Sequence, residues 1–175
     1  MKVLNIHKRI INQPKNKVVD LINTLSTDND KIWPKEKWPA MKFAGGINIG
    51  AKGGHGPIKY VVEKYNSEQI IQFRFEKPEG FNGIHKFEIE PINKNETLIK
   101  HTIEMQTAGI GTLLWVLGIR SLHNALIEDS FDKIENNFLV DKKTSEWSFW
   151  VKYLRKKIGK SKKNQSKQND KSAFD

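Results

Sequence analysis

The sequence predicts an α+β fold in which a curved antiparallel sheet wraps around one long C-terminal helix. Apolar residues alternate with polar ones in several segments between residues 58 and 105, as in strands with one buried face. Short turns connect these segments, so neighbouring strands should run antiparallel. Residues 119–139 instead repeat apolar side chains at helical spacing, and that side must pack on the sheet. This order excludes a parallel nucleotide-binding sheet.

The first elements are a strand and two short helices. Residues 2–12 form the strand, and two alternating sets of side chains compete for its inward face. One set contains Val3, His7 and Ile11, and the other contains Leu4, Ile6 and Ile10. Pro14 stands where a helix can begin, and the apolar spacing predicts an end near Ser26. The turn-rich stretch that follows is expected to form a short helix or loop over an apolar surface, with the large residues Trp33, Trp38, Met41 and Phe43.

A run of strands follows Gly45. Their inward faces are expected to contain Ile58, Tyr60 and Val62, then Ile71, Phe73 and Phe75, then His85, Phe87 and Ile89, then Ile99, His101, Ile103 and Met105. If the turn at residues 92–97 closes symmetrically, Phe87 lies opposite His101, and His85 lies diagonally from His101 within about 7 to 8 Å. Two histidines thus face the interior from adjacent strands.

Residues 119–139 give the clearest helix. At about 100° per residue its apolar side collects Ile119, Leu122, Leu126, Ile127, Phe131, Ile134 and Phe138. His123 lies near the centre of this stripe and is expected to face the sheet. Glu128, Asp132 and Glu135 lie on the opposite side, where a solvated face is a better interpretation than a catalytic pair of carboxylates.

Four stretches occur in the order expected of one known superfamily. They are RIINQPKNKVVDLI, GAKGGHGPIKY, RFEKPEGFNGIHKFEIEP and RSLHNALIEDSFDKIE. Through them, residues 3–139 resemble the START and polyketide-cyclase-like (SRPBCC) superfamily, which has the helix-grip fold. The glycine-rich stretch also resembles plant pathogenesis-related class-ten proteins, which share that fold. The resemblance implies a helix-grip domain over residues 1–139, followed by a basic amphipathic extension over residues 140–175.

The same resemblance implies a hydrophobic cavity between the sheet and the long helix. Members of the superfamily use it for lipids, sterols, polyketides, hormones or aromatic compounds. Some members are cyclases or hydrolases and many only bind or carry, and they share no catalytic residue that could be transferred to this chain. The resemblance therefore predicts the fold more sharply than the chemistry.

Composition excludes several kinds of site and indicates where an anionic partner would bind. The chain contains no cysteine, which excludes disulfides, thiolate nucleophiles and sulfur-ligated metals. Residues 141–175 contain eleven Lys and Arg against four Asp and Glu, a net of +7, which leaves +3 of the total +10 for residues 1–140. An anionic partner is therefore expected to meet the tail. Nucleic acid is disfavoured because no binding motif supports it.

The N-terminal residues lack the apolar run of a signal peptide, so we expect a cytoplasmic protein, peripheral at the membrane if the tail binds one. The oligomeric state is left open by the sequence.

Candidate ligand-binding residues follow from the inward faces. They are Tyr60, Phe73, Phe75, His85, Phe87, His101, Met105 and His123. The histidines allow three interpretations: buried core groups with internal partners, ligand-binding groups in a cavity, or catalytic groups, with His85 and His101 as candidate general bases. No HExxH motif, acidic metal pair or nucleophile elbow is present, so we expect neither a metal nor another cofactor.

Two further segments are distinctive. The loop GAKGGHGP has four glycines but neither a Walker motif nor a following helix, so a turned rim beside the cavity is favoured over a phosphate site, and His55 is expected to be exposed. Residues 108–119, AGIGTLLWVLGI, are apolar on all sides. They are too short to span a membrane, which requires about 20 residues of helix. They form either the buried beginning of the long helix or a cavity lid that contacts a membrane through Leu113, Leu114 and Trp115.

The C-terminal extension has a helical pattern with a basic side. Its apolar residues are Trp147, Trp150, Val151, Leu154 and Ile158, and its basic ones are Lys152, Arg155, Lys156 and Lys157. This composition is typical of a helix at an anionic membrane surface, although the apolar stripe could equally pack on the protein's own body or on a second copy. The remainder, from Gly159 on, is low in apolar content and expected to be disordered.

Three functional hypotheses result. The first is a protein that binds or carries a hydrophobic or aromatic small molecule in an internal cavity. The second is a metal-free cyclase, dehydratase or hydrolase with a cavity histidine as general base. The third is a membrane-surface lipid-exchange protein that uses residues 108–119 and the basic tail. Single polar groups on otherwise apolar inward faces favour the first.

Overall fold

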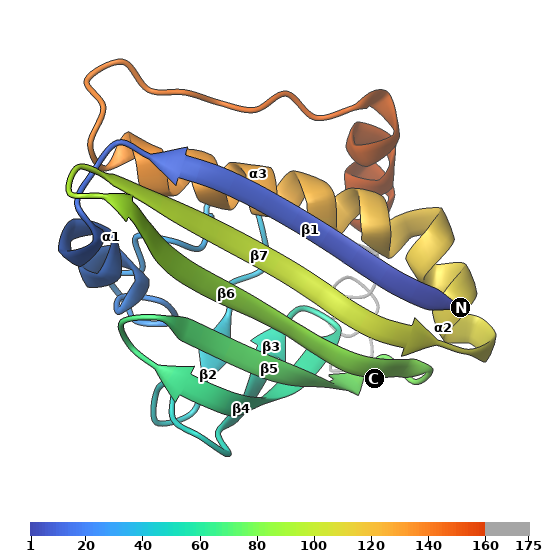
Figure 1. Ribbon diagram of the computed structural model, residues 1–175. Coiled ribbons are helices and arrows are strands. Elements are labelled where there is room, and N and C mark those ends of the chain that lie inside the picture. Colours follow the sequence, from blue (N-terminus) through green and yellow to red (C-terminus); the bar gives the residue numbers. More distant parts are fainter. Residues whose placement is uncertain (160–175) are drawn as a thin grey trace, which may run out of the picture.

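The computed structural model describes residues 1–159, which form a curved antiparallel sheet packed against a long helix (Figure 1). The seven strands are β1 (Lys2–Ile11), β2 (Lys42–Phe43), β3 (Lys52–His55), β4 (Ile58–Asn66), β5 (Ile70–Lys77), β6 (Phe81–Asn93) and β7 (Glu96–Thr107). Their order across the sheet is β1-β7-β6-β5-β4-β3-β2, so consecutive strands from β2 to β7 form a meander and β1 closes its far edge. The predicted fold class is confirmed.

The helices are α1 (Lys15–Ile22), α2 (Gly109–Leu114), the π-helix η1 (Trp115–Ile119) and α3 (Arg120–Asn136), and residues 149–159 form a further C-terminal helical segment. Together α2, η1 and α3 make one run of 28 residues, Gly109–Asn136, that is long and apolar enough to cross a membrane by length and composition. Its second half carries Phe131 and Ile134, both completely buried against the sheet. Such burial is typical of a core helix.

The pairing of β6 with β7 places the histidines. Phe87 lies opposite His101, and His85 lies opposite Ile103, one step along the diagonal. The predicted register of this hairpin is therefore confirmed. His7 of β1 also pairs with His101, so β7 carries its histidine between two neighbouring strands.

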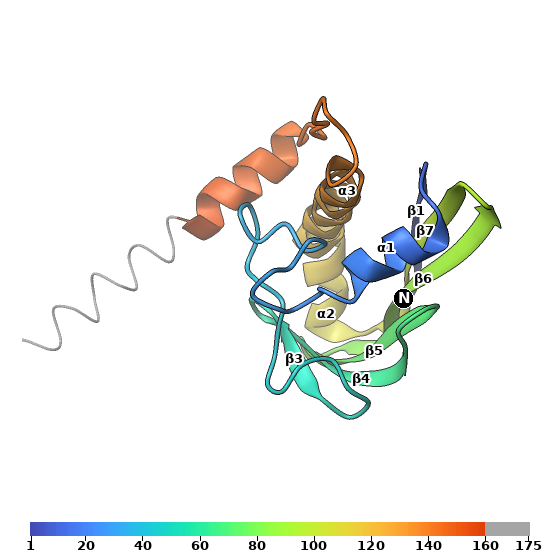
Figure 2. The ribbon, with the colours of Figure 1, turned by 90° about the vertical axis from the view of Figure 1, so that its left-hand side faces the viewer.

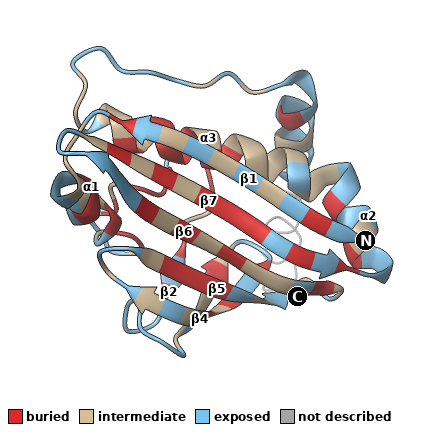
Figure 3. Cartoon of the chain, in the orientation of Figure 1, coloured by how far each residue is buried: buried red, intermediate tan, exposed pale blue. Residues whose placement is uncertain are grey.

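Of the two alternating sets of β1 side chains, the one that contains Val3, His7 and Ile11 faces the interior. Asn5, His7 and Arg9 contact α3, whereas Leu4, Ile6 and Ile10 lie exposed on the outer surface. Hydrogen bonds to Asn124 and Glu128 explain the choice, because polar groups that approach each other between layers need partners. Figure 3 shows the resulting alternation of buried and exposed residues along the strands.

Of the two short helices expected after β1, α1 is formed, and residues 23–41 continue as a series of turns. The buried carboxylate of Asp30 fastens these turns by accepting the backbone N–H groups of Ser26, Ile32 and Trp33 at 2.8 to 2.9 Å. A side chain that satisfies the backbone in this way competes with helix formation. The stretch still buries Trp33 and Trp38 as expected.

The C-terminal helical segment packs back on the body. Val151 is buried, and the indole N–H of Trp147 donates to Asp129 of α3 at 2.8 Å. In Figure 2 the segment lies across α3 from β1. Of the alternatives left open by the sequence, packing on the protein's own body is what the structure shows for Trp147 and Val151, whereas Trp150 and Ile158 of the same stripe are 44% and 40% exposed. The disorder expected from Gly159 onward falls, after that residue, outside the described part of the chain.

Candidate functional site

A cavity of about 630 Å³ lies between the sheet and the α3 layer. Its deep walls come from the sheet, α3 and η1, and its outer side comes from the turns around Trp33 and from the C-terminal helical segment. The lining residues are Trp33, Trp38, Pro39, His55, Gly56, Pro57, Ile58, Phe75, Phe81, His85, His101, Ile103, Trp115, Ile119, Leu122, His123, Leu126, Ile127, Arg155 and Ile158. Gly56, Pro57 and Ile158 are also exposed to solvent, so they mark its mouth.

The predicted ligand-binding residues divide into two groups. Phe75, His85, His101 and His123 line the cavity. Tyr60, Phe73 and Phe87 are buried in the main core beside these side chains but are not among the lining residues, and Met105 belongs to a smaller core cluster around Trp115. The structure therefore brings the three predicted histidines to one cavity, whereas four of the five other candidates do not line it.

All five histidines of the chain lie in one row. Ring centroids are 5.9 Å apart between His7 and His123, 4.9 Å between His123 and His101, and 5.7 Å between His101 and His85. The row continues through the ring of Tyr60, which lies 4.6 Å from His85 and 6.0 Å from His55. Side chains from β1, α3, β7, β6, β4 and β3 thus form one continuous series of ring contacts through the interior.

Several polar atoms in this row are buried without a hydrogen-bond partner among the described residues. They are Nε2 of His85, Nδ1 of His101, both ring nitrogens of His123 and the hydroxyl oxygen of Tyr60. A buried polar group without a partner typically costs about 1 to 3 kcal/mol. The wall of the cavity therefore keeps hydrogen-bonding capacity that a polar occupant, including water, can use.

Burial also determines the charge of these groups. Burial lowers the pKa of His123 to about 3, with a further contribution from His7 and His55. It holds the pKa values of His85 and His101 well below the ordinary value of 6.5 and raises the pKa of the Tyr60 hydroxyl. These three imidazoles and the phenol are therefore uncharged near neutral pH, and each neutral imidazole has one N–H donor and one acceptor nitrogen.

His55 is not exposed as its glycine-rich loop suggested. Its ring is half-buried, stacks at 4.8 Å on Trp33 and lines the cavity. Gly53 explains the local geometry, because a Cβ there would lie 2.5 Å from the ring of Phe43. The glycines thus let β3 pack closely against β2, and the following residues form the rim expected beside the cavity.

The histidines form a row and do not converge on a point. Within residues 1–159 no three His, Asp or Glu side chains are grouped so that they could hold a metal ion. What the row offers chemically is hydrogen bonding along an otherwise apolar wall. Sequence reasoning missed the outer lining, namely Trp38, Arg155 and Ile158, although the richness of residues 33–43 in aromatic side chains indicated an apolar cover.

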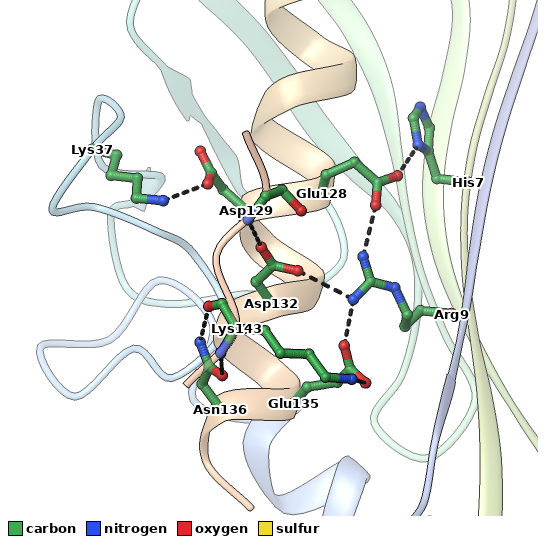
Figure 4. A network of polar contacts seen from close by, with 10 residues as sticks. His7, Arg9, Lys37, Glu128, Asp129, Asp132, Glu135, Asn136 and Lys143 are labelled. Carbon is green, nitrogen blue, oxygen red and sulfur yellow. Dashed lines mark hydrogen bonds and ion pairs between the residues drawn. The ribbon is translucent and has the colours of Figure 1, made fainter. Parts of the chain in front are cut away.

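The acidic side of α3 is not a solvated face, as Figure 4 shows. Arg9 of β1 donates to Glu128 at 2.7 Å and to Asp132 at 3.2 Å, and it also pairs with Glu135. His7 contacts the other oxygen of Glu128 at 2.8 Å. Burial by itself would lower the pKa of Arg9, but the hydrogen bonds that its guanidinium donates to these carboxylates raise it. The helical pattern could not reveal this network because the cation comes from a strand more than 100 residues away.

Asp129 connects three segments at one carboxylate. Its fully buried side chain accepts the indole N–H groups of Trp38 at 2.7 Å and Trp147 at 2.8 Å, and it pairs with Lys37 at 2.5 Å. Arg155 adds a second fastening, because its guanidinium lies 4.6 Å from the centre of the Trp38 ring and donates to the carbonyl of Lys37. The outer wall of the cavity is therefore held to α3 by charge-assisted hydrogen bonds.

The membrane-contact candidates also divide. Leu113, Leu114, Trp150, Lys152, Lys156 and Lys157 are exposed. Trp115 is only 3% exposed and packs against Phe81, and both Trp147 and Arg155 turn toward the body, so these three do not form an outer surface. Residues 108–119 are thus neither wholly buried nor wholly exposed.

Comparisons with known proteins concern the fold. No protein-family model and no curated protein matches this sequence. Truncated norcoclaurine synthase from Thalictrum flavum matches with a TM-score of 0.61 at 13% identity, over 81% of this chain and 96% of that one. A structural-genomics protein from Nitrosospira multiformis matches with a TM-score of 0.60 at 13% identity, over 79% and 97%.

A further structure of the Thalictrum flavum synthase, in complex with dopamine and hydroxybenzaldehyde, matches with a TM-score of 0.60 at 12% identity, over 82% of this chain and 90% of that one. At such low identity these matches establish the architecture alone. This chain therefore has a helix-grip fold, as its sequence predicted.

Proposed function

We propose that this protein binds and carries an uncharged aromatic or otherwise apolar small molecule that has one or two polar groups. The observation that carries the proposal is the set of unpartnered imidazole and phenol atoms in or beside an apolar cavity. A volume of about 630 Å³ suits a small organic ligand, since such sites typically measure about 300 to 1,000 Å³.

The chemistry of the wall selects the class of ligand. Neutral imidazoles both donate and accept hydrogen bonds, so a hydroxyl, carbonyl or amide group can pair with them. A carboxylate or an ammonium group would lose its hydration without meeting an opposite charge at the deep wall, which makes binding costly. Hydroxybenzaldehyde, one of the two compounds in the Thalictrum flavum complex, is an uncharged phenol of this class, whereas dopamine also carries an ammonium group.

A matched pair of probes tests the proposal. We expect 2-naphthol to bind about ten-fold more tightly than naphthalene, because its hydroxyl pairs with an imidazole and the rings are otherwise alike. Quenching of tryptophan fluorescence reports binding, since Trp33, Trp38 and Trp115 line the cavity. Replacing His101 with Phe should remove the preference for the hydroxyl, and replacing the exposed Leu4 with Phe should not change it.

Two results would count against this function. If wild-type protein binds neither probe, the cavity is not a binding site for this class. If it binds both equally, the imidazoles do not orient the ligand. Native mass spectrometry of protein purified from its own cells gives an independent measurement, because a carrier is expected to retain its natural ligand.

A second candidate function is a cyclase, dehydratase or hydrolase reaction in which His85 or His101 acts as general base. The unpartnered ring nitrogens of these residues favour it, because no protein donor occupies the lone pair that a base needs. Burial counts against it, because the lowered pKa values of both imidazoles make them weaker bases. Binding without catalysis therefore has the better support. If the protein turns over a substrate, and both His85→Gln and His101→Gln abolish turnover while binding is retained, catalysis would have better support than binding alone.

The third candidate, lipid exchange at an anionic membrane through residues 108–119 and the tail, is favoured by the exposed apolar side chains of that segment. It requires a surface on the protein that can meet a bilayer.

A further inference from the structure

Helices α2 and η1 expose an unusual number of large apolar side chains. The outer residues are Ile110, Leu113, Leu114, Val116 and Leu117, which are 41 to 61% exposed. The inner residues of the same helices, Trp115 and Ile119, line the cavity. Figure 3 shows exposed residues predominating on α2. This short segment therefore separates the cavity from an apolar outer surface.

The C-terminal helical segment extends that surface. The indole N–H of Trp150 donates to the carbonyl of Leu117 at 3.1 Å, which places the segment directly beside η1. Trp150 and Tyr153 stack with their ring centroids 5.4 Å apart, and Phe149 is 84% exposed. The outer sides of α2, η1 and residues 149–159 thus join into one surface, here called the apolar face.

Positive charge borders the apolar face. On the C-terminal helical segment Lys152, Lys156 and Lys157 are exposed, as are the three aromatic residues, and the ammonium of Lys157 lies 5.6 Å from the ring of Tyr153. Arg120, the first residue of α3, is exposed one turn beyond Leu117. Residues 108–121 and 149–159 contain no Asp or Glu. The surface therefore combines aliphatic, aromatic and cationic side chains without an acidic residue.

We propose that the apolar face docks on the surface of an anionic lipid bilayer. Large apolar patches are rare on proteins that remain free in water, and they mark interaction sites. Aromatic rings with adjacent lysines suit the membrane interface, where the rings enter the headgroup region and the ammonium groups attract anionic lipids. The docking surface is independent of the cavity's ligand.

Charge argues against a second copy of this chain as the occupant. Self-association through the apolar face would bring the cationic residues of one copy, Lys152, Lys156 and Arg120, close to the cationic residues of the other. No acidic residue in either outer segment could pair with them. Like charges brought together at an interface are destabilising, whereas anionic headgroups neutralise them.

Sedimentation with lipid vesicles tests the proposal. The full chain is expected to sediment with vesicles of phosphatidylcholine that contain phosphatidylserine, and much less with pure phosphatidylcholine. In a Leu113→Glu, Leu117→Glu double variant the partition coefficient should fall at least ten-fold, because two apolar side chains no longer enter the interface. The matched control is Leu4→Glu, Ile6→Glu on the outer side of β1, where exposure is 68% and 47% against 56% and 61%.

Charge gives a second readout. A Lys152→Gln, Lys156→Gln variant should lose about five-fold in partition for each lysine on the phosphatidylserine vesicles, since one basic residue near such a surface contributes about 1 kcal/mol. It should lose nothing on pure phosphatidylcholine.

Three outcomes would overturn the proposal. One is the absence of sedimentation with anionic vesicles, and another is undiminished sedimentation of the Leu113→Glu, Leu117→Glu variant, which would assign binding to the tail alone. The third is a wild-type protein that is dimeric in analytical ultracentrifugation and does not bind vesicles, together with a monomeric Leu113→Glu, Leu117→Glu variant. That result would make the apolar face an interface between copies. The naphthol measurements are made without lipid, so failure of docking and failure of ligand binding are distinguishable.

Discussion

Acidification should destabilise this fold through its buried imidazoles. His85, His101 and His123 are neutral in the folded protein because burial holds their pKa values far below 6.5, with His123 at about 3. In the unfolded chain each titrates near 6.5. Below that pH the unfolded state binds more protons than the folded state, so stability is fully present above pH 6.5 and is lost as the pH falls toward 3.

The size of the effect follows from the difference in proton binding. At pH 5.0 each of the three imidazoles lowers the free energy of unfolding by about 2 kcal/mol relative to pH 7.5. Together they remove about 6 kcal/mol, and His55, whose pKa burial lowers to about 4, adds a similar loss for one more group. The total is comparable to the typical stability of about 5 to 15 kcal/mol. We therefore expect a steep loss of stability between pH 6.5 and pH 5.

Urea unfolding, followed by tryptophan fluorescence at pH 7.5, 6.0 and 5.0, measures this loss. A His101→Leu variant should lose about 2 kcal/mol less than the wild type over the same range, whatever its stability at pH 7.5, because one titrating group is gone. The neighbouring control Phe87→Leu should keep the full loss of the wild type. A change below about 1 kcal/mol in the wild type, or ring NMR signals of His85, His101 and His123 that titrate near 6.5 in the folded protein, would refute the reasoning.

Two further predictions concern the charged residues of the layer interface. Replacing Arg9 with Met leaves Glu128, Asp132 and Glu135 without their shared cation and should cost about 3 kcal/mol in urea unfolding, whereas Arg74→Met, which breaks the more exposed pair with Glu63, should cost less than about 1 kcal/mol. Replacing Asp129 with Ala should release the C-terminal helical segment and accelerate tryptic cleavage at Lys152, while the Lys37→Ala control, which keeps both indole hydrogen bonds to Asp129, should change cleavage much less. An Arg9 variant as stable as the wild type, or unchanged cleavage in the Asp129 variant, would contradict these roles.

Local patterns predicted the parts of the fold in which sequence neighbours are also neighbours in space. The alternation around His85 and the short turn at residues 92–97 were sufficient to place Phe87 opposite His101. Helical periodicity likewise placed His123 toward the sheet. Both predictions depend only on the geometry of a single hairpin or a single helix.

The missed features depend on partners that are distant in the sequence. In β1 both alternating sets contain apolar residues, and the hydrogen bonds of Asn5 and His7 to α3 decide which set faces inward. Glu128 was predicted to be solvated because the helical periodicity of α3 contains no information about Arg9, which lies opposite it on β1. Arg155 looked like a surface cation because the ring of Trp38, on which it stacks, comes from a loop without regular structure.

The row of histidines has a practical consequence for spectroscopy. The chain has five histidines, and four of them line the cavity while the fifth, His7, lies next in the row. Selective isotope labelling of histidine would therefore give a spectrum of five ring systems with no signal from an uninvolved surface site. Compounds from a mixed library could be screened by chemical-shift changes in that spectrum alone, and the ring that responds first would locate the contact without any mutation.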